Sequence, residues 1–282
     1  MHGNIMKNMI AGSESRRPMP KVTVVTVVLN AVGVIDRTLK SVIAQDYPNL
    51  QYIVVDGCSN DGTLELLKKY GDKIDKLISE RDGGIYEAMN KGTSVATGEW
   101  ILFMNAGDLF VDSSVITRVF SVRDWEECDV VYGDGIFSNN IRRLKERAPD
   151  QVTLTDGNGF SHQSTFIRTA VQRKYGFDVD ERIAADYDLF LRLYKDKKVF
   201  RRVDVVISEF FIGGFSTRPP METIRLRHRV YKKHLPRSDL FLYLRLADRA
   251  LKMAGRAIVP AKVWEAVKWF RDRRKVMSDG SY

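Results

Sequence analysis

Polar side chains with ligand or acid–base chemistry follow four apolar segments in the first half of the chain. Each apolar segment has the length of a buried strand, and each polar group comes at or just beyond its end: Asn30, Asp56, 80–82 and 105–108. Carboxylates can bind divalent cations, accept hydrogen bonds from a nucleotide base, or take a proton from a hydroxyl. Strands also end in ordinary polar turns, so one such group is weak evidence, but four together favour a binding site.

The segments between these groups alternate between two hydrophobic periodicities. Apolar runs over 21–29, 51–55, 76–79 and 100–104 predict buried strands. Helices are predicted over 35–44, after Asp61 as N-cap, and over 84–96. This alternation predicts an α/β fold, with a mostly parallel sheet flanked by helices. Ligands of such sheets bind at the carboxyl ends of the strands, where the polar groups lie.

Several other classes of protein lack support in the sequence. No GxGxxG motif follows the first strand, which argues against a nicotinamide enzyme, and no GxxxxGK[ST] phosphate loop occurs. The two cysteines, Cys58 and Cys128, belong to no CxxC or Cys/His cluster, which argues against a disulfide framework or a zinc site. We expect both thiols to be reduced in the cytoplasm.

The two ends of the chain differ from its middle. Residues 1–20 are polar and lack the apolar stretch of a signal peptide, so we expect a disordered leader. No run of about 18 apolar residues predicts a membrane span. Residues 219–282 hold 16 Lys or Arg against 6 Asp or Glu, whereas the rest holds 29 against 30. We therefore predict a catalytic domain over 21–218 and a basic helical extension over 219–282.

Taken in order, the motifs resemble the family 2 glycosyltransferases, which have a GT-A fold, and particularly their bacterial exopolysaccharide and O-antigen branch. The resemblance covers 21–216 and rests on VTVVTVVLNA, LKSVIAQDYPNLQYIVVDGCSNDGT, SERDGGIYEAMNKGTSVATGEWILFMNAGD, SHQSTFIR, AADYDLFLRL and FFIGGFS. It implies an inverting, metal-dependent transferase that moves a sugar from a nucleotide-sugar donor, a UDP-sugar or less often a GDP-sugar. The implied acceptor is a glycan or lipid-linked glycan of a cell-surface polysaccharide such as lipopolysaccharide.

The resemblance also implies a set of nucleotide-binding residues. Asp56 falls on the first aspartate of the family's VDDGSTDGT segment, which bonds the base, while Gly57 replaces the second. Asp82 and two glycines precede a helix, whose first N–H groups favour an anion. Lys91 then either approaches a phosphate or belongs to the polar face of that helix. The predicted set is Thr26, Asn30, Asp56, Asp82 and Lys91.

The segment FMNAGD occupies the family's D-x-D position, where acidic side chains hold a divalent metal on the diphosphate. Asn105 and Gly107 replace two positions of that motif, so Asp108 alone keeps a carboxylate. The resemblance therefore implies Mn²⁺ or Mg²⁺ on Asp108, because such ions need few protein ligands when diphosphate and water complete the coordination. The alternative is that Asp108 caps a loop. Ala106 and Gly107 are predicted to lie near the donor sugar.

The predicted general base is Asp186, which matches the aspartate of the family's Glu-Asp pair, with Ala185 in place of the glutamate. It would take a proton from the acceptor hydroxyl during one displacement that inverts the anomeric carbon. Alternatively, Asp186 only caps its helix. Three further sites are predicted near the donor or acceptor sugar, each with a structural alternative: Asp188, His162, which could also contact the metal, and the loop glycines Gly213 and Gly214.

The basic extension suggests a second partner. Its predicted helices place Trp264 and Trp269 beside Lys and Arg residues, a pattern typical of helices on an anionic membrane surface. We expect a cytoplasmic protein, peripheral on the inner face of the plasma membrane, near a polyprenyl-linked acceptor. The alternative is a basic face packed on the catalytic domain or on another subunit. No motif supports nucleic-acid binding.

Two rival functions remain for the catalytic domain. A nucleotidyltransferase would carry a glycine-rich, basic phosphate loop after the first strand, and residues 29–33 lack one. A non-catalytic sugar-binding or scaffolding protein is suggested by Asn105, Gly107 and Ala185, which depart from the family's acidic residues. The joint presence of Asp56, Asp108 and Asp186 favours an active enzyme.

Overall fold

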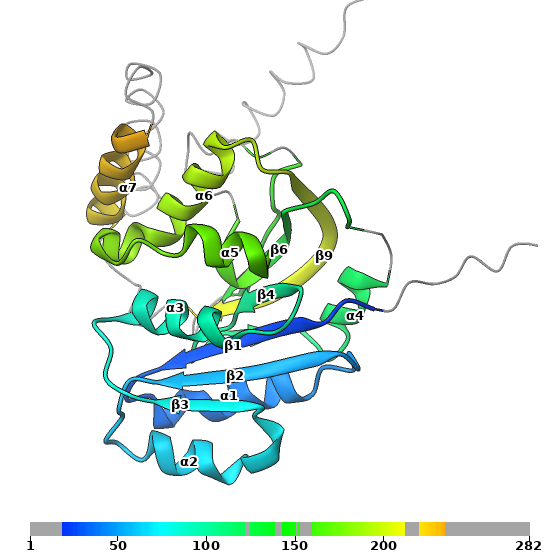
Figure 1. Ribbon diagram of the computed structural model, residues 1–282, viewed down its shortest axis with the longest axis vertical. Coiled ribbons are helices and arrows are strands. Elements are labelled where there is room, and N and C mark those ends of the chain that lie inside the picture. The colour runs from blue at the N-terminus through cyan, green and yellow to red at the C-terminus, as the bar shows by residue number, and fades with distance from the viewer. Residues whose placement is uncertain are drawn as a thin grey trace, which may run out of the picture.

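The computed structural model describes residues 19–121, 125–138, 143–150, 152, 160–211 and 220–234. Within them, one nine-stranded sheet has the order β3-β2-β1-β4-β8-β6-β9-β5, and β7 pairs with β6 beside that path. Helices cover both faces of the sheet, as Figure 1 shows. The predicted α/β fold with a helix-flanked sheet is therefore confirmed.

The first half of the sheet is parallel. Strands β1 (Val22–Val28), β2 (Leu50–Asp56), β3 (Lys76–Ser79) and β4 (Trp100–Phe103) pair in parallel, β1 with β2 and β4, and β2 with β3. Every residue of β1 is buried, which explains its unbroken apolar sequence. The connecting helices are α1 (Val32–Ile43), α2 (Thr63–Lys69), the 3₁₀ turn η1 (Gly71–Lys73) and α3 (Ile85–Val95). Apart from η1, each of these elements was predicted, with its first residue placed to within three positions.

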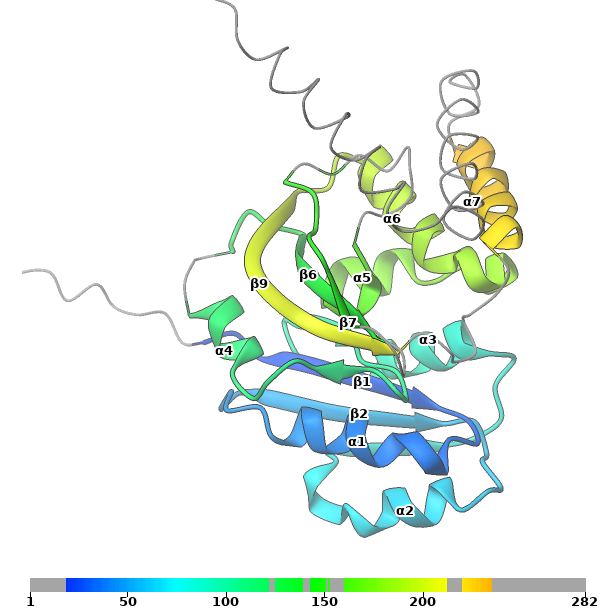
Figure 2. The same cartoon turned by 180° about the vertical axis from the view of Figure 1, so that it is seen from behind.

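The second half of the sheet is mixed. It consists of β5 (Leu109–Phe110), β6 (Val130–Ser138), β7 (Arg143–Glu146), β8 (Thr165–Arg168) and β9 (Phe200–Phe211). Four pairs are antiparallel: β4 with β8, β6 with β8, β6 with β7, and β5 with β9. The pair of β6 and β9 is parallel. The expected parallel pairing thus describes the first half. Figure 2 shows β9 curving along β6, and a Cβ on Gly133 would lie 2.5 Å from the Val205 carbonyl oxygen, so glycine permits this close approach.

Two hydrophobic cores lie on opposite faces of the sheet. One packs α1 and α4 (Val115–Phe120) against the sheet through Leu39 and Val119. The other packs α3, α5 (Thr169–Tyr175), α6 (Ala185–Lys195) and α7 (Pro220–His234) through Met89, Phe190 and Val230. The 3₁₀ turns η2 (His162–Ser164) and η3 (Val179–Ala184) precede β8 and α6. Packing on the two faces of the sheet therefore holds these helices in place.

The start of α2 differs slightly from the prediction. Gly62, with φ of 95°, is the N-cap, and Asp61 lies one residue earlier. The Asp61 carboxylate still accepts hydrogen bonds from the backbone and the hydroxyl of Thr63 and from the backbone N–H of Val32. Asp61 therefore ties the beginning of α2 to the beginning of α1.

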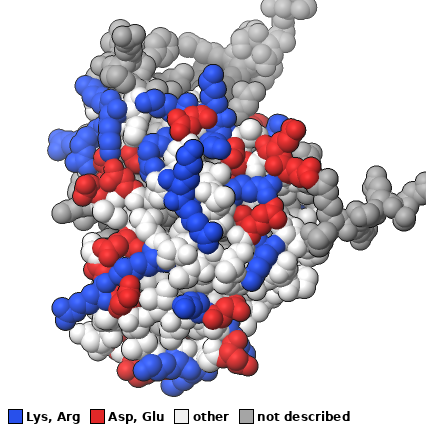
Figure 3. All heavy atoms as spheres, in the orientation of Figure 1, with Lys and Arg blue, Asp and Glu red and all other residues white. Residues whose placement is uncertain are grey.

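The predicted basic extension is described only through its first helix. That helix, α7, begins at Pro220 and packs on α6 and η3. Figure 3 shows Lys and Arg side chains over α7 with acidic side chains beside them. The leader as far as residue 18, the extension beyond 234, and Gly213 and Gly214 lie outside the described residues.

The part of the chain that the structure describes contains no helix both long and apolar enough to cross a membrane. Both cysteines are free; Cys58 is exposed, and burial raises the pKa of the Cys128 thiol to about 11.

Candidate active site

The loops after β1, β2 and β4 meet at one edge of the sheet. The backbone N–H of Gly57 donates to the Val28 carbonyl (2.9 Å), and that of Ala106 donates to the Val27 carbonyl (3.1 Å). The N–H of Glu80 donates to the Asp56 carbonyl (3.0 Å). The polar groups that were expected to share one edge are therefore adjacent in the fold.

Asp56 is the buried acid at the centre of this edge. Its carboxylate accepts hydrogen bonds from the Ser79 hydroxyl (2.7 Å) and the Ser59 N–H (3.2 Å). A Cβ on Gly57 would lie 2.7 Å from Asp82 Oδ2 and 3.3 Å from Leu29 Cδ1. Asp82 therefore occupies the space that a second aspartate after Asp56 would need. Asp56 and Asp82, both predicted nucleotide ligands, lie close together, with Leu29 adding an exposed apolar side chain.

Asn30 joins two of the loops. Its φ is 49°, in the left-handed region that asparagine tolerates better than most residues. Its N–H donates to the Ser59 hydroxyl (2.8 Å), and its side-chain oxygen accepts from the Asn60 N–H (2.9 Å). Asn30 thus lies at the predicted edge and shapes the loop that follows Asp56.

Thr26 does not lie where its prediction requires. It is fully buried, and its hydroxyl donates to the Met104 carbonyl (2.8 Å) and bonds with the Tyr52 hydroxyl (2.9 Å). A side chain in the middle of β1 points into a core, because only residues at the strand end reach the edge. Thr26 is therefore a core residue rather than a nucleotide ligand.

Lys91 matches the alternative to phosphate binding. Its ammonium donates to the Arg81 carbonyl (2.6 Å) and pairs with Glu80 (3.1 Å) and Glu87 (3.4 Å). The N–H groups at the start of α3 are also engaged, that of Gly83 by Glu87 and that of Gly84 by Asp82. The chain's own carboxylates accept the hydrogen bonds of the predicted anion site, and Lys91 forms the ion pairs expected of a helix's polar face.

Asp108 is a buried carboxyl in the turn after β4. It is 5% exposed and accepts a hydrogen bond from Gln163 Nε2 (2.9 Å). Burial raises its pKa from 3.8 to about 7, although His162 and the bond from Gln163 act in the opposite direction. A buried carboxyl of this kind gains strongly from a divalent cation, which compensates the charge in place of water.

The rest of the turn explains two departures from D-x-D. Gly107 has a φ of 100°, which disfavours a larger residue, and its N–H donates to the Thr38 hydroxyl (2.9 Å). Asn105 is 7% exposed, and its Oδ1 is buried without a hydrogen-bond partner among the described residues. Asp108 and this orphaned amide oxygen are hard oxygen donors from one turn, so the residues present fit Mg²⁺ or Mn²⁺. Ala106 lies half-buried between them.

Asp186 lies in the first turn of α6, on the other side of His162. Its side chain is 15% exposed, and its Oδ1 accepts from the Tyr187 N–H (2.7 Å). Its Oδ2 lies 3.6 Å from Nδ1 of His162. Burial raises the pKa of Asp186, but His162 and the more distant Arg227 outweigh that effect and hold the pKa below 3.8. Asp186 is therefore ionised at neutral pH, the form that a general base requires.

Asp188 serves the fold instead of a sugar. It is fully buried, and its carboxylate bonds with Arg192 (2.7 Å) and with His234 of α7 (2.6 Å). Asp188 also lies near Asp178 and Glu181 in an acidic cluster, but Lys233 is 2.9 Å from both of those acids. Basic side chains of α7 neutralise this cluster, so the structural alternative for Asp188 replaces the sugar contact.

Three contributors were missed by sequence reasoning. Gln163 and Ser79 bond the two buried aspartates of the edge, and Arg227 approaches Asp186 from α7. Gln163 directly follows His162 in the SHQS motif, so its position was a usable signal. No local signal marks Ser79 or Arg227, because their partners are remote in sequence.

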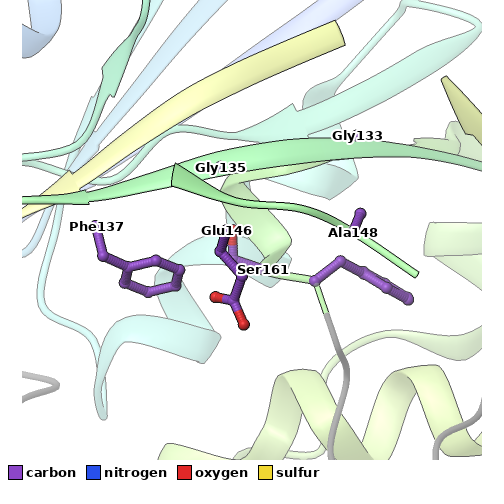
Figure 4. A pocket seen from close by; sticks show the side chains of 7 residues that line it. Gly133, Gly135, Phe137, Glu146, Ala148 and Ser161 are labelled. Carbon is purple, nitrogen blue, oxygen red and sulfur yellow. The ribbon is translucent and has the colours of Figure 1, made fainter. Parts of the chain in front are cut away.

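A separate small pocket lies beside β6 and β7 (Figure 4). It is lined by Gly133, Gly135, Phe137, Glu146, Ala148, Phe160 and Ser161. None of the predicted site residues lines it, although Ser161 directly precedes His162. The pocket is therefore distinct from the edge that holds Asp56 and Asp108.

Comparison with known proteins agrees with this geometry. The sequence model described as Glycosyl transferase family 2 matches residues 23–198. A PGL/p-HBAD biosynthesis glycosyltransferase of Mycobacterium tuberculosis is 30% identical over 265 residues, which cover 90% of this chain and 99% of that protein. The putative glycosyltransferase EpsE of Bacillus subtilis is 25% identical over 189 residues, covering 63% of this chain and 68% of that one.

Solved structures share the fold at low identity. The structure of S. aureus TarS 1-349 has a TM-score of 0.62 at 18% identity, covering 89% of this chain and 78% of that one. The mannosyltransferase PcManGT from Pyrobaculum calidifontis, in complex with GDP-Man and Mn²⁺, has a TM-score of 0.57 at 16% identity, covering 91% and 81%. These likenesses confirm the GT-A fold. With the family match spanning more than half of the sequence, the chain belongs to glycosyl transferase family 2.

Proposed function

We propose that the protein is an inverting, metal-dependent transferase that moves a hexosyl group from a nucleotide sugar to a glycan or lipid-linked glycan of the cell surface. Asp56 and Asp82 receive the nucleoside, Asp108 holds Mn²⁺ or Mg²⁺, and Asp186 is the general base. The observation that carries the proposal is the placement of an ionised Asp186 on one side of His162 and the turn of Asp108 on the other.

The chemistry assigned to the chain's own residues is a proton transfer coupled to one displacement. The Asp186 carboxylate takes the proton of the acceptor hydroxyl as that oxygen bonds to the anomeric carbon. The bond from that carbon to the diphosphate breaks on the opposite face, which inverts its configuration. A divalent cation at Asp108 would supply charge neutralisation for the leaving diphosphate.

The donor class is supported by two structural neighbours. One TarS structure contains UDP-GlcNAc, and PcManGT contains GDP-Man. We favour a UDP-sugar here, with a GDP-sugar as the second candidate. The carboxylate of Asp56 fits either nucleotide, because uracil and guanine both present a ring N–H donor.

The scaffold alternative loses its main argument in the geometry. Gly107 is required by a positive φ, and Asn105 bonds with His162. Two of the three departures from the family's acidic residues thus have a local structural reason that is compatible with catalysis. They do not leave a gap in the site.

The cellular setting is also a proposal. We propose that residues 219–282 form an extension that places the enzyme on the cytoplasmic face of the plasma membrane. Arg225 and Arg229 of α7 are exposed and would face anionic headgroups favourably. Co-sedimentation with vesicles of anionic lipid, but not of zwitterionic lipid, supports this placement, and equal recovery with both contradicts it.

Donor hydrolysis tests the catalytic assignment without knowledge of the acceptor, because water can replace the acceptor hydroxyl. Release of UDP or GDP from a panel of nucleotide sugars is measured with Mn²⁺ for the wild type and Asp186→Asn. We expect the substitution to lower turnover by about 100-fold or more. Asp72→Asn is the matched control, since Asp72 is an exposed residue of η1 near the amino end of β3. Full turnover by Asp186→Asn would remove Asp186 as the base.

A further inference from the structure

We infer that Asn105 and His162 form a positioning pair for Asp186. Asn105 fixes the orientation and tautomer of the His162 ring, and His162 in turn orients the Asp186 carboxylate. The inference rests on the proposed function, because it takes Asp186 as the base. It also explains why an asparagine stands where the family's metal motif begins.

Three elements bring these side chains together. Asn105 follows β4, His162 begins η2, and Asp186 lies in the first turn of α6. Asn105 Nδ2 lies 3.1 Å from Nε2 of His162, and His162 Nδ1 lies 3.6 Å from Asp186 Oδ2. The first distance is a hydrogen bond, and the second becomes one after a shift of about 0.5 Å.

The chemistry of the amide decides the tautomer of the ring. An amide NH₂ can only donate, so the His162 Nε2 beside it must accept. The ring proton then lies on Nδ1, which faces the Asp186 carboxylate and can donate to it. With the amide nitrogen toward Nε2, as observed, the neutral ring presents its N–H to Asp186.

An aspartate at position 105 would undo this arrangement. A carboxylate accepts but does not donate, so it would draw the ring proton to Nε2. The ring would then either turn a lone pair toward Asp186 or become a cation between two carboxylates. The first result weakens the contact that orients Asp186, and the second places a positive charge beside the carboxylate and lowers its basicity. Asn105 is therefore suited to His162 in a way that the isosteric acid is not.

The two contacts leave the base held on both sides. Asp186 Oδ1 accepts from the Tyr187 N–H, and Oδ2 faces His162. Loss of the His162 contact removes the group that faces Oδ2 and so loosens the orientation of the carboxylate. A misplacement of about 1 Å can cost about 100-fold in rate, so we expect a large effect on turnover. Donor binding, which involves Asp56 and Asp108, is expected to change little.

The test compares four variants by donor hydrolysis: His162→Ala, His162→Asn, His162→Gln and Asn105→Asp. His162→Ala is expected to lower kcat by about 10- to 100-fold with donor KM within about threefold of the wild type, and Asn105→Asp is expected to lower kcat by a similar factor. The asparagine amide reaches the position of Nδ1 and the glutamine amide that of Nε2. We therefore expect His162→Asn, and not His162→Gln, to recover at least part of the lost kcat.

The outcomes separate this inference from the proposed function. An unchanged kcat in His162→Ala and Asn105→Asp, or a loss confined to KM, overturns the positioning role. Equal kcat in His162→Asn and His162→Gln does the same, because a purely structural role has no preference for Nδ1. Circular dichroism melts identify any variant that fails to fold. If Asp186→Asn keeps full turnover, the proposed function fails first, whatever the His162 variants show.

Discussion

Replacement of Asp108 by asparagine should stabilise the metal-free protein at high pH. The folded-state pKa of Asp108 is raised by burial from 3.8 to about 7. The folded state then holds this proton more tightly than the unfolded state, so the protein loses stability as pH rises from about 4 to about 7. Each pKa unit is worth about 1.4 kcal/mol, which gives a loss of about 4 kcal/mol above pH 7.

The amide introduced by Asp108→Asn mimics the protonated acid and can still accept the hydrogen bond from Gln163 through its side-chain oxygen. The variant should therefore be more stable than the wild type by about 1 to 2 kcal/mol at pH 5 and by about 4 kcal/mol at pH 8. Urea unfolding in the presence of EDTA measures both differences. Titrating groups that do not interact with Asp108 cancel, because they behave alike in the two proteins. A difference that stays constant between pH 5 and pH 8 would refute the claim that Asp108 is a buried carboxyl with a raised pKa.

Further predictions concern the helix clamp, the turn and the metal. Asp188→Ala should lower the free energy of unfolding, measured in urea, by about 3 kcal/mol, because it leaves Arg192 and His234 without their buried partner. The exposed control Asp180→Ala should stay within about 0.5 kcal/mol of the wild type. Equal losses in the two variants would contradict the clamp. Gly107→Ala should cost about 1–2 kcal/mol in the same measurement, because its φ is 100°, and no loss would show that the turn relaxes freely. Removal of metal by EDTA should abolish the rise in melting temperature produced by a nucleoside diphosphate, and persistence of that rise would exclude metal-assisted binding.

The first half of the fold was predictable because each element there carries its own signal. Strands buried on both faces read as unbroken apolar runs, and the helices between them carry one apolar face. The carboxyl ends of parallel strands then place Asn30, Asp56 and Asp108 at one edge. The order of these elements follows the chain, so no long-range pairing had to be guessed.

The second half was less predictable because its pairings join distant segments. β8 pairs antiparallel with both β4 and β6, and β9 pairs in parallel with β6. No local periodicity reveals such partners. The position of Arg227 near Asp186 depends on how α7 packs on α6, which the sequence of α7 alone does not encode.

Two residues predicted to bind the nucleotide, Thr26 and Lys91, have protein partners in this structure. Thr26 is polar but has Met104 and Tyr52 as buried partners, so its hydroxyl serves the core. Lys91 is satisfied by Glu80 and Glu87, which lie within one helical turn or the preceding loop. The i, i+4 spacing of Glu87 and Lys91 was visible in the sequence and could have favoured the ion pair.

The most direct test of the account is calorimetric titration of UDP and GDP into the wild type and Asp108→Asn, each with Mn²⁺ and with EDTA. The account predicts that at least one nucleotide binds the wild type in the presence of Mn²⁺, and that affinity falls by at least about tenfold on removing the metal or replacing Asp108. Asp72→Asn should bind like the wild type. Absence of binding by both nucleotides, or binding unaffected by Mn²⁺ and by Asp108→Asn, would contradict a metal-dependent nucleotide-sugar site at this edge of the sheet.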